Sequence, residues 1–142
     1  MKKSDLISQK TADCSQIENI NCAQTTLKVL SDIFNVQLET QTFIAATGLN
    51  GAGEYGAQCG LVDGTLMFLG IIGNIQALSK EKIAEMCRTF AEEFEARFGS
   101  LLCVELRPEG FKEDNPPDLC NSRICEAIHF AYKFIEKQII IL

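Results

Sequence analysis

Apolar residues recur along much of this chain at the spacing of an α-helix that faces a core. A first helix is predicted after Asn19 or Asn21, either of which can cap it, because an apolar stripe follows at i, i+4, i+7 and i+11: Ala23, Leu27, Leu30 and Phe34. A short second helix is expected from about Glu39 to Thr47, and Gly48 ends it.

A longer amphipathic pattern follows Ser79, a suitable N-cap, and ends at Gly99. Its apolar stripe comprises Ile83, Met86, Cys87, Phe90, Phe94 and Phe98. The short apolar run 101–106 suits either a strand or a helical turn, because periodicity does not separate the two over so few residues.

The last pattern predicts a helix that starts at Asp118 or Asn121 and runs to about Gln138, after a loop over 108–117. Its inward stripe comprises Ile124, Ile128, Ala131 and Ile135. These patterns, with no confident strand, favour an all-α, single-domain bundle of about five helices over residues 1–142, in which residues 1–18 form a polar leader.

The central segment combines a glycine-rich loop with the most apolar stretch of the chain. Six glycines lie from Gly48 to Gly64, which predicts positive φ angles or close approach by other groups. A helix is expected from Ala57 through Leu78. If it is helical throughout, Gly56, Gly60 and Gly64 share one face, where a neighbouring backbone or a cofactor can approach.

Charge and length exclude two classes of partner. The net charge is −6 and no stripe of Lys and Arg is present, so a nucleic-acid partner is not expected. The apolar stretch 66–75 is ten residues long, whereas a bilayer crossing needs about 20, so no membrane insertion is expected. Residues 4–15 are polar and lack the apolar core of a secretion signal, which predicts a cytoplasmic protein.

Seven cysteines in such a chain are the unusual feature of the composition. In a reducing compartment, cysteines more often bind metals, catalyse reactions or sense redox state than form structural disulfides. There is no C-x-x-C pair, which argues against a thioredoxin motif and a zinc ribbon.

Two of the cysteines are predicted at helix N-termini, where the helix dipole lowers the pKa of a thiol. Cys22 falls in the first turn of its helix, although a small buried residue would also suit that position. Cys59 lies at a junction between the glycine-rich loop and a helix, with little apolar packing to account for it. Cys59 is therefore the stronger functional candidate.

The other cysteines are distinguished by their patterns. Cys87 falls on an apolar stripe and is assigned to the core, whereas Cys14 lies in the polar leader and is expected to be exposed and incidental. Cys103 lies within a short apolar run. Cys120 and Cys125 are five residues apart and so face different sides of a helix, with Cys125 pointing more nearly inward.

Other reactive groups are few. The only histidine, His129, is expected at the surface or the edge of the core. Asp63 is either a carboxylate near the thiols or a first-turn acid that complements a helix N-terminus.

The segment Cys59-Gly60-Leu61-Val62-Asp63-Gly64 resembles the motif of the C_GCAxxG_C_C family of redox-active proteins, with leucine at 61 where the family usually has alanine. The similarity runs from about Asn21 to Ala131 and places the family's four cysteines at Cys22, Cys59, Cys103 and Cys125, with Cys120 as a rival for the fourth. A related arrangement in split-Soret cytochromes is associated with a two-iron, two-sulfur cluster. The resemblance therefore implies a redox role and, by extension, cluster ligation by these four cysteines, whereas the absence of C-x-x-C-H excludes haem attachment.

Three functions are compatible with these features. The first is electron transfer through an iron–sulfur cluster to an unknown redox partner protein, with Gly56, Gly60 and Gly64 letting backbone N–H groups approach the cofactor. The second is thiol–disulfide chemistry, in which Cys59 attacks and Cys22 or Cys103 resolves. The third is a non-catalytic module that binds zinc or a partner, in which the apolar tail 139–142 completes the core or a homodimer contact.

Overall fold

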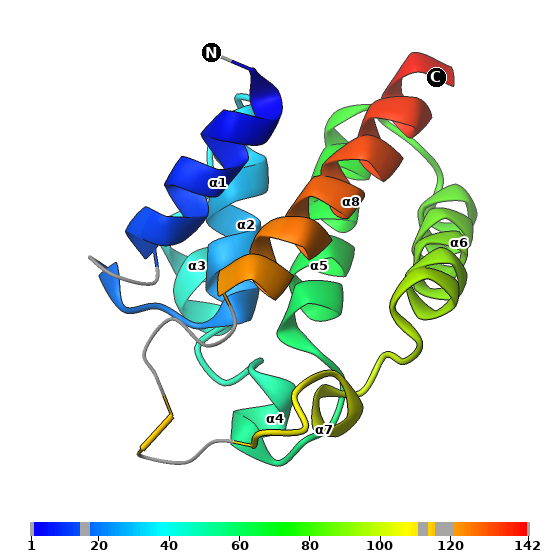
Figure 1. The fold of residues 1–142 in the computed structure, drawn as a ribbon. Coiled ribbons are helices and arrows are strands. Elements are labelled where there is room, and N and C mark those ends of the chain that lie inside the picture. The colour runs from blue at the N-terminus through cyan, green and yellow to red at the C-terminus, as the bar shows by residue number, and fades with distance from the viewer. Residues whose placement is uncertain (1, 15–17, 111–113, 116–120, 142) are drawn as a thin grey trace.

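The computed structural model describes residues 2–14, 18–110, 114–115 and 121–141, and over these residues the fold is all-α, as predicted (Figure 1). The helices in chain order are α1 (Lys3–Asp13), α2 (Cys22–Ile33), α3 (Thr40–Ala45), α4 (Gly51–Glu54), α5 (Gly60–Ile75), α6 (Lys80–Phe98), α7 (Cys103–Leu106) and α8 (Asn121–Ile141). Helices α1, α2, α5, α6 and α8 form the bundle, and the short α4 and α7 lie side by side at its lower end in Figure 1.

Helix α2 begins where the sequence predicts. The side chain of Asn21 accepts a hydrogen bond from the Gln24 backbone N–H at 2.8 Å, and the Gln24 side chain accepts one from the Asn21 N–H at 3.3 Å. This capping box fixes the first turn of α2. The predicted stripe is confirmed, because Ala23, Leu27 and Leu30 are fully buried.

Helix α5 is the central helix, and its predicted start is wrong by three residues. The chain is extended at Cys59, and Gly56 has a φ of +97°, so the helix starts at Gly60 rather than at Ala57. Gly56 is therefore not on the helix face that Gly60 and Gly64 share. The helix ends at Ile75, before Leu78.

Helices α6 and α8 pack through aromatic side chains. The predicted cap is confirmed by a hydrogen bond from the Lys82 N–H to the Ser79 hydroxyl at 3.1 Å, and Gly99 ends α6 at a φ of +92°. The cluster between the two helices comprises Phe90, Phe94, Phe98, Phe130 and Phe134.

Helix α8 buries the inward stripe predicted for it, with Ile128, Ala131 and Ile135 at the core. Of the apolar tail, Ile139 packs against the core, while the side chains of 140–142 lie outside the described residues. The described part of the chain contains no helix long and apolar enough to span a bilayer.

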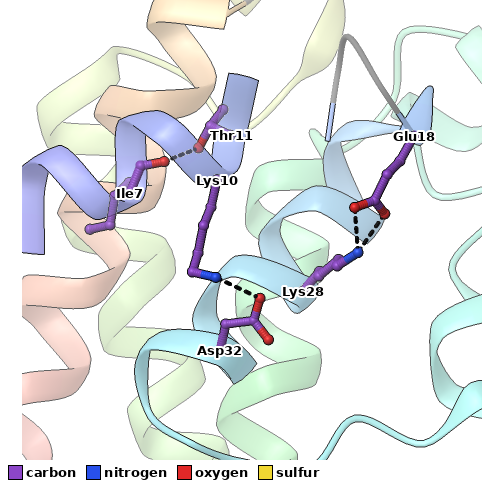
Figure 2. A network of polar contacts seen from close by, with 6 residues as sticks. All are labelled: Ile7, Lys10, Thr11, Glu18, Lys28 and Asp32. Carbon is purple, nitrogen blue, oxygen red and sulfur yellow. Dashed lines mark hydrogen bonds and ion pairs between the residues drawn. The ribbon is translucent and has the colours of Figure 1, made fainter. Parts of the chain in front are cut away.

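Part of the polar leader is helical. Residues 3–13 form α1, which packs on α8 and α2. Ile7 and Thr11 are buried, and the buried Thr11 hydroxyl donates to the Ile7 carbonyl at 2.7 Å (Figure 2). Ion pairs from Lys10 to Asp32 and from Lys28 to Glu18 join α1 and the segment after it to α2 (Figure 2).

The expectation that Cys14 is exposed is wrong, because Cys14 is only 2% exposed. It continues the buried stripe of Ile7 and Thr11 at helical spacing. Burial raises the pKa of its thiol to about 11, so Cys14 is a neutral core residue at physiological pH. A stripe of only three positions in a polar segment is too narrow to stand out in the sequence.

Candidate thiol site

Three cysteines from distant parts of the chain meet at one end of the bundle. Cys22 is the first residue of α2, Cys59 is the N-cap residue of α5, and Cys103 is the first residue of α7. The starts of these three helices lie together at the lower end of Figure 1. The three thiols interact electrostatically. Negative charge on Cys59 or Cys103 raises the pKa of Cys22, and negative charge on Cys103 raises the pKa of Cys59.

An antiparallel pair of short extended segments joins two of these thiols. The Cys59 N–H donates to the Leu101 carbonyl at 2.8 Å, and the Cys103 N–H donates to the Ala57 carbonyl at 2.7 Å, on either side of a β-bridge between Gln58 and Leu102. Side chains alternate between the two faces of such a pair. Cys59 and Cys103 therefore share one face, as diagonal neighbours, and Leu102 lies on the other. The run 101–106, which the sequence left open, is thus a bridge followed by a helical turn.

The third thiol reaches this pair because α2 and α5 approach closely through glycines. A Cβ atom on Gly60 would lie 2.4 Å from the Cys22 Sγ and 2.6 Å from the Leu49 carbonyl oxygen. A Cβ atom on Gly64 would lie 2.7 Å from the Ala23 carbonyl oxygen. The predicted close approach at these two glycines is confirmed, and the group that approaches is the start of α2.

Helix α4 is a left-handed turn that holds Cys103 from the other side. Gly51, Ala52, Gly53 and Glu54 have φ angles of +70°, +58°, +64° and +69°. This conformation costs about 1–2 kcal/mol for each residue with a side chain, here Ala52 and Glu54. A Cβ atom on Gly51 would lie 2.9 Å from the Cys103 Cβ and 3.1 Å from its Sγ. Gly51 was missed as a site residue, because glycine density alone does not say which glycine touches a cysteine.

Backbone N–H groups at the two helix N-termini lower the pKa of two thiols. Those of Gly60 and Ala23 act on Cys22, and those of Leu61 and Val62 act on Cys59. Burial nevertheless dominates, and it raises the pKa of Cys22 to about 12 and that of Cys59 to about 11. The lowered pKa predicted for Cys59 is therefore wrong for the protein without a bound cation, because desolvation outweighs the helix N-terminus.

Asp63 has both of the roles considered for it. It lies in the first turn of α5, and its charge raises the pKa of Cys59. The Gln58 side-chain amide donates to the Asp63 carboxylate at 2.5 Å. Burial raises the pKa of Asp63, and the Gln58 hydrogen bond opposes that shift.

Of the remaining cysteines, Cys125 is half-buried on α8, while Cys120 lies outside the described residues. Cys87 packs against the core, as predicted. In the part of the chain that the structure describes, no three His, Cys, Asp or Glu side chains are arranged closely enough to hold a metal ion.

His129 lies one helical turn after Cys125 and is half-buried, so its prediction as a core-edge residue is confirmed. Its ring lies 6.3 Å from that of Tyr132. Its Nδ1 atom is buried and has no hydrogen-bond partner among the described residues.

The arrangement of the thiols can be set beside known families. Residues 20–134 match the family described as putative redox-active protein (C_GCAxxG_C_C). The chain belongs to this family. The C_GCAxxG_C_C match contains Cys22, Cys59, Cys103 and Cys125, whereas Cys14 and α1 precede it. No curated protein and no solved structure matches the chain.

Proposed function

We propose that this protein transfers electrons through an iron–sulfur cluster held by Cys22, Cys59 and Cys103, with Cys125 or Cys120 as the fourth ligand. The observation that carries the proposal is the convergence of three thiols, from three separate segments, on the N-termini of α2 and α5. A family described as redox-active supports it.

The donor atoms suit such a cofactor by their chemistry, and binding would have to draw the three thiols closer together than they lie in the described structure. Thiolates are the usual ligands of iron–sulfur clusters, and hydrogen bonds to sulfur tune the reduction potential. Four backbone N–H groups lower the pKa of Cys22 and Cys59 and so favour their thiolate forms. Gly60 leaves the Cys22 sulfur next to the start of α5, where any larger residue would collide with it.

The raised thiol pKa values favour ligation over a free nucleophile. At neutral pH, a thiol with a pKa of about 11 or 12 is protonated and attacks disulfides slowly. A metal cation removes this obstacle, because it stabilises the thiolates and releases their protons as it binds.

The fourth ligand is the open part of the proposal. Cys125 is half-buried on the first turns of α8. Cys120 precedes α8 by one residue in the sequence. Both are retained as ligand candidates.

When bound, the cluster supplies one-electron chemistry. The chain's own residues would hold the thiolates, and four backbone N–H groups lower the pKa of two of them. They also shield the site from water, since Cys59 and Cys103 are buried. A dry site with fixed dipoles rearranges little when the charge of the cluster changes. This small rearrangement suits electron transfer.

A dithiol mechanism is the second candidate, and it is favoured by the shared face of Cys59 and Cys103. Oxidation would join the two sulfurs, with two electrons and two protons passing to an acceptor of the thiol–disulfide or quinone class. The raised pKa of Cys59 argues against rapid exchange at neutral pH.

Anaerobic purification and reconstitution test the proposal. The expected result is coloured protein with iron and acid-labile sulfide and a signal from the reduced cluster in electron paramagnetic resonance. Single Cys→Ser variants at 22, 59 and 103 should lose most of the iron, whereas Cys87→Ser should keep it. Substitution of Cys120 or Cys125 identifies the fourth ligand.

Colourless, iron-free protein after reconstitution would overturn the proposal. A zinc content that follows the same cysteines would then assign a structural metal site. A reversible disulfide between Cys59 and Cys103 would assign the dithiol mechanism.

A further inference from the structure

We propose that Tyr55, Leu102 and Val104, here called the tip patch, form the docking surface for a basic electron-carrier protein. The inference rests on the proposed function, because it names the partner of the same site. Two observations support it: the position of exposed apolar side chains relative to the thiols, and the charges around those side chains.

Large apolar side chains are exposed in the tip patch to an unusual extent. Tyr55 is 87% exposed, Val104 59% and Leu102 41%. Among the described residues, the other large apolar side chains with such exposure are Ile44 and Ile75. Exposed apolar groups that gather in one place are typical of interaction sites, whereas scattered single ones are not.

The three residues are neighbours through the α4–α7 contact. The Val104 N–H donates to the Gly56 carbonyl at 3.1 Å, and the Val104 Cβ lies 3.0 Å from the position of a Cβ on Gly56. Tyr55 directly precedes Gly56, and Leu102 pairs with Gln58 in the β-bridge. Figure 1 shows α4 and α7 side by side at the end of the bundle.

The tip patch covers the thiol site from outside. Leu102 points to the face of the bridge opposite to Cys59 and Cys103, so one layer of two extended segments separates the patch from both sulfurs. A partner seated on the patch would therefore approach the site more closely than at the opposite end of the bundle, where the two chain termini lie (Figure 1).

The backbone under Tyr55 is strained. Ala52 and Glu54 adopt left-handed φ angles of +58° and +69°, and Tyr55 follows them directly. Strained residues of this kind cluster at functional sites. Here the turn holds Gly51 against Cys103 on one side while the ring of Tyr55 remains in solvent on the other.

The charges favour a basic partner. Residues 48–63 and 100–106 contain three acids, Glu54, Asp63 and Glu105, and no Lys, Arg or His. Glu54 and Glu105 are exposed, and the first cation beyond these segments is Arg107, whose Nε donates to the Gly110 carbonyl. With a net charge of −6, the whole molecule attracts cationic partners.

A small apolar centre with an acidic surround fits a transient redox encounter. Such complexes bury little surface, less than about 1,200 Å², and depend on complementary charge for their rate of formation. A second copy of this acidic chain would instead bring like charges together.

Binding of zinc-substituted cytochrome c, a basic and redox-inactive probe, tests the inference. Titrations followed by nuclear magnetic resonance at low and physiological salt should give a dissociation constant that rises steeply with salt. Glu54→Lys with Glu105→Lys should weaken binding by roughly tenfold or more, and Tyr55→Ser with Val104→Ser should weaken it several-fold. Matched controls are the double variants Glu81→Lys with Glu92→Lys and Ile44→Ser with Ile75→Ser, which change exposed acids and exposed apolar residues elsewhere.

The docking surface would be overturned if all four variants bound the cytochrome equally well. It would also be overturned if an acidic flavodoxin bound as tightly as the cytochrome, or if the protein formed a dimer that Tyr55→Ser disrupts. Iron content measured on the same samples separates this inference from the proposed function. If the protein is iron-free but binds in the expected pattern, the proposed cluster is wrong and the docking surface stands. If the protein is iron-loaded but does not bind in this pattern, the docking surface is wrong and the proposed cluster stands.

Discussion

Gly60 and Cys22 are packed so closely that the residue at 60 must be glycine for the sulfur to occupy its place. A Cβ atom at 60 would lie 2.4 Å from the Cys22 Sγ and 2.9 Å from the Ala23 backbone N. The N–H of the same glycine lowers the pKa of that thiol. One residue thus sets both the spacing of α2 and α5 and the electrostatics of the thiol.

Gly60→Ala should therefore destabilise the protein and displace Cys22. We expect a loss of about 1–3 kcal/mol in the free energy of unfolding, since the neighbours include backbone atoms that cannot move aside. Urea unfolding measures the loss, and iron content after reconstitution reports the effect on the site.

Gly70→Ala is the matched control on the same helix. Nothing lies within 4 Å of a Cβ at Gly70, so alanine there should stabilise α5 by about 0.5–1 kcal/mol through helix propensity. If both alanine variants changed the free energy of unfolding equally, the close approach at Gly60 would not contribute to stability.

Gly51 and Gly53 offer a second matched pair. Both have left-handed φ angles, +70° and +64°, but only Gly51 would place a Cβ against Cys103. Alanine at either position should cost about 1 kcal/mol or more from the backbone. Gly51→Ala alone should also lower iron content and speed alkylation of Cys103 in the metal-free protein. Equal effects of the two variants on Cys103 would show that the turn, and not the contact, positions this cysteine.

The helices were predictable from sequence because their signals are local. Asn21, Ser79 and Gly99 cap helices that have wide apolar stripes, and each of these predictions is confirmed. The start of α5 was not predictable, because residues 57–59 pair with residues 101–103, which are distant in the chain. Helical periodicity contains no information on such a pairing.

The site was predictable in part for the same reason. Cys22 and Cys59 were placed at helix N-termini correctly, but their pKa values depend on burial by the whole bundle. The buried stripe of α1 was missed because only Ile7, Thr11 and Cys14 form it.

Stability of the metal-free protein should fall as the pH rises from about 9 toward 12. The ordinary thiol pKa is 9.0, and burial raises that of Cys22 to about 12 and that of Cys59 to about 11. In this range the folded protein binds more protons than the unfolded chain, so the free energy of unfolding decreases with pH. The contribution is fully present below pH 9 and is lost as the pH passes through the folded-state values.

Urea unfolding in chelator and reductant at pH 8 and pH 10.5 measures this change. Other groups titrate in the same range, so the control is a Cys22→Ala, Cys59→Ala double variant, which should lose a clear part of the pH dependence. An unchanged dependence in the double variant would contradict burial of neutral thiols at the site.

Cys14 should matter for stability and not for redox chemistry. It is buried at the C-terminal end of α1 and precedes the family match, which begins at residue 20. Cys14→Ser should cost about 1–3 kcal/mol, because a hydroxyl at this position needs a hydrogen-bond partner that sulfur does not. Cys14→Ala, which buries no polar atom, should cost less. Both variants should keep the iron content and the reduction potential of the unaltered protein, and a loss of iron from either would place Cys14 among the ligands.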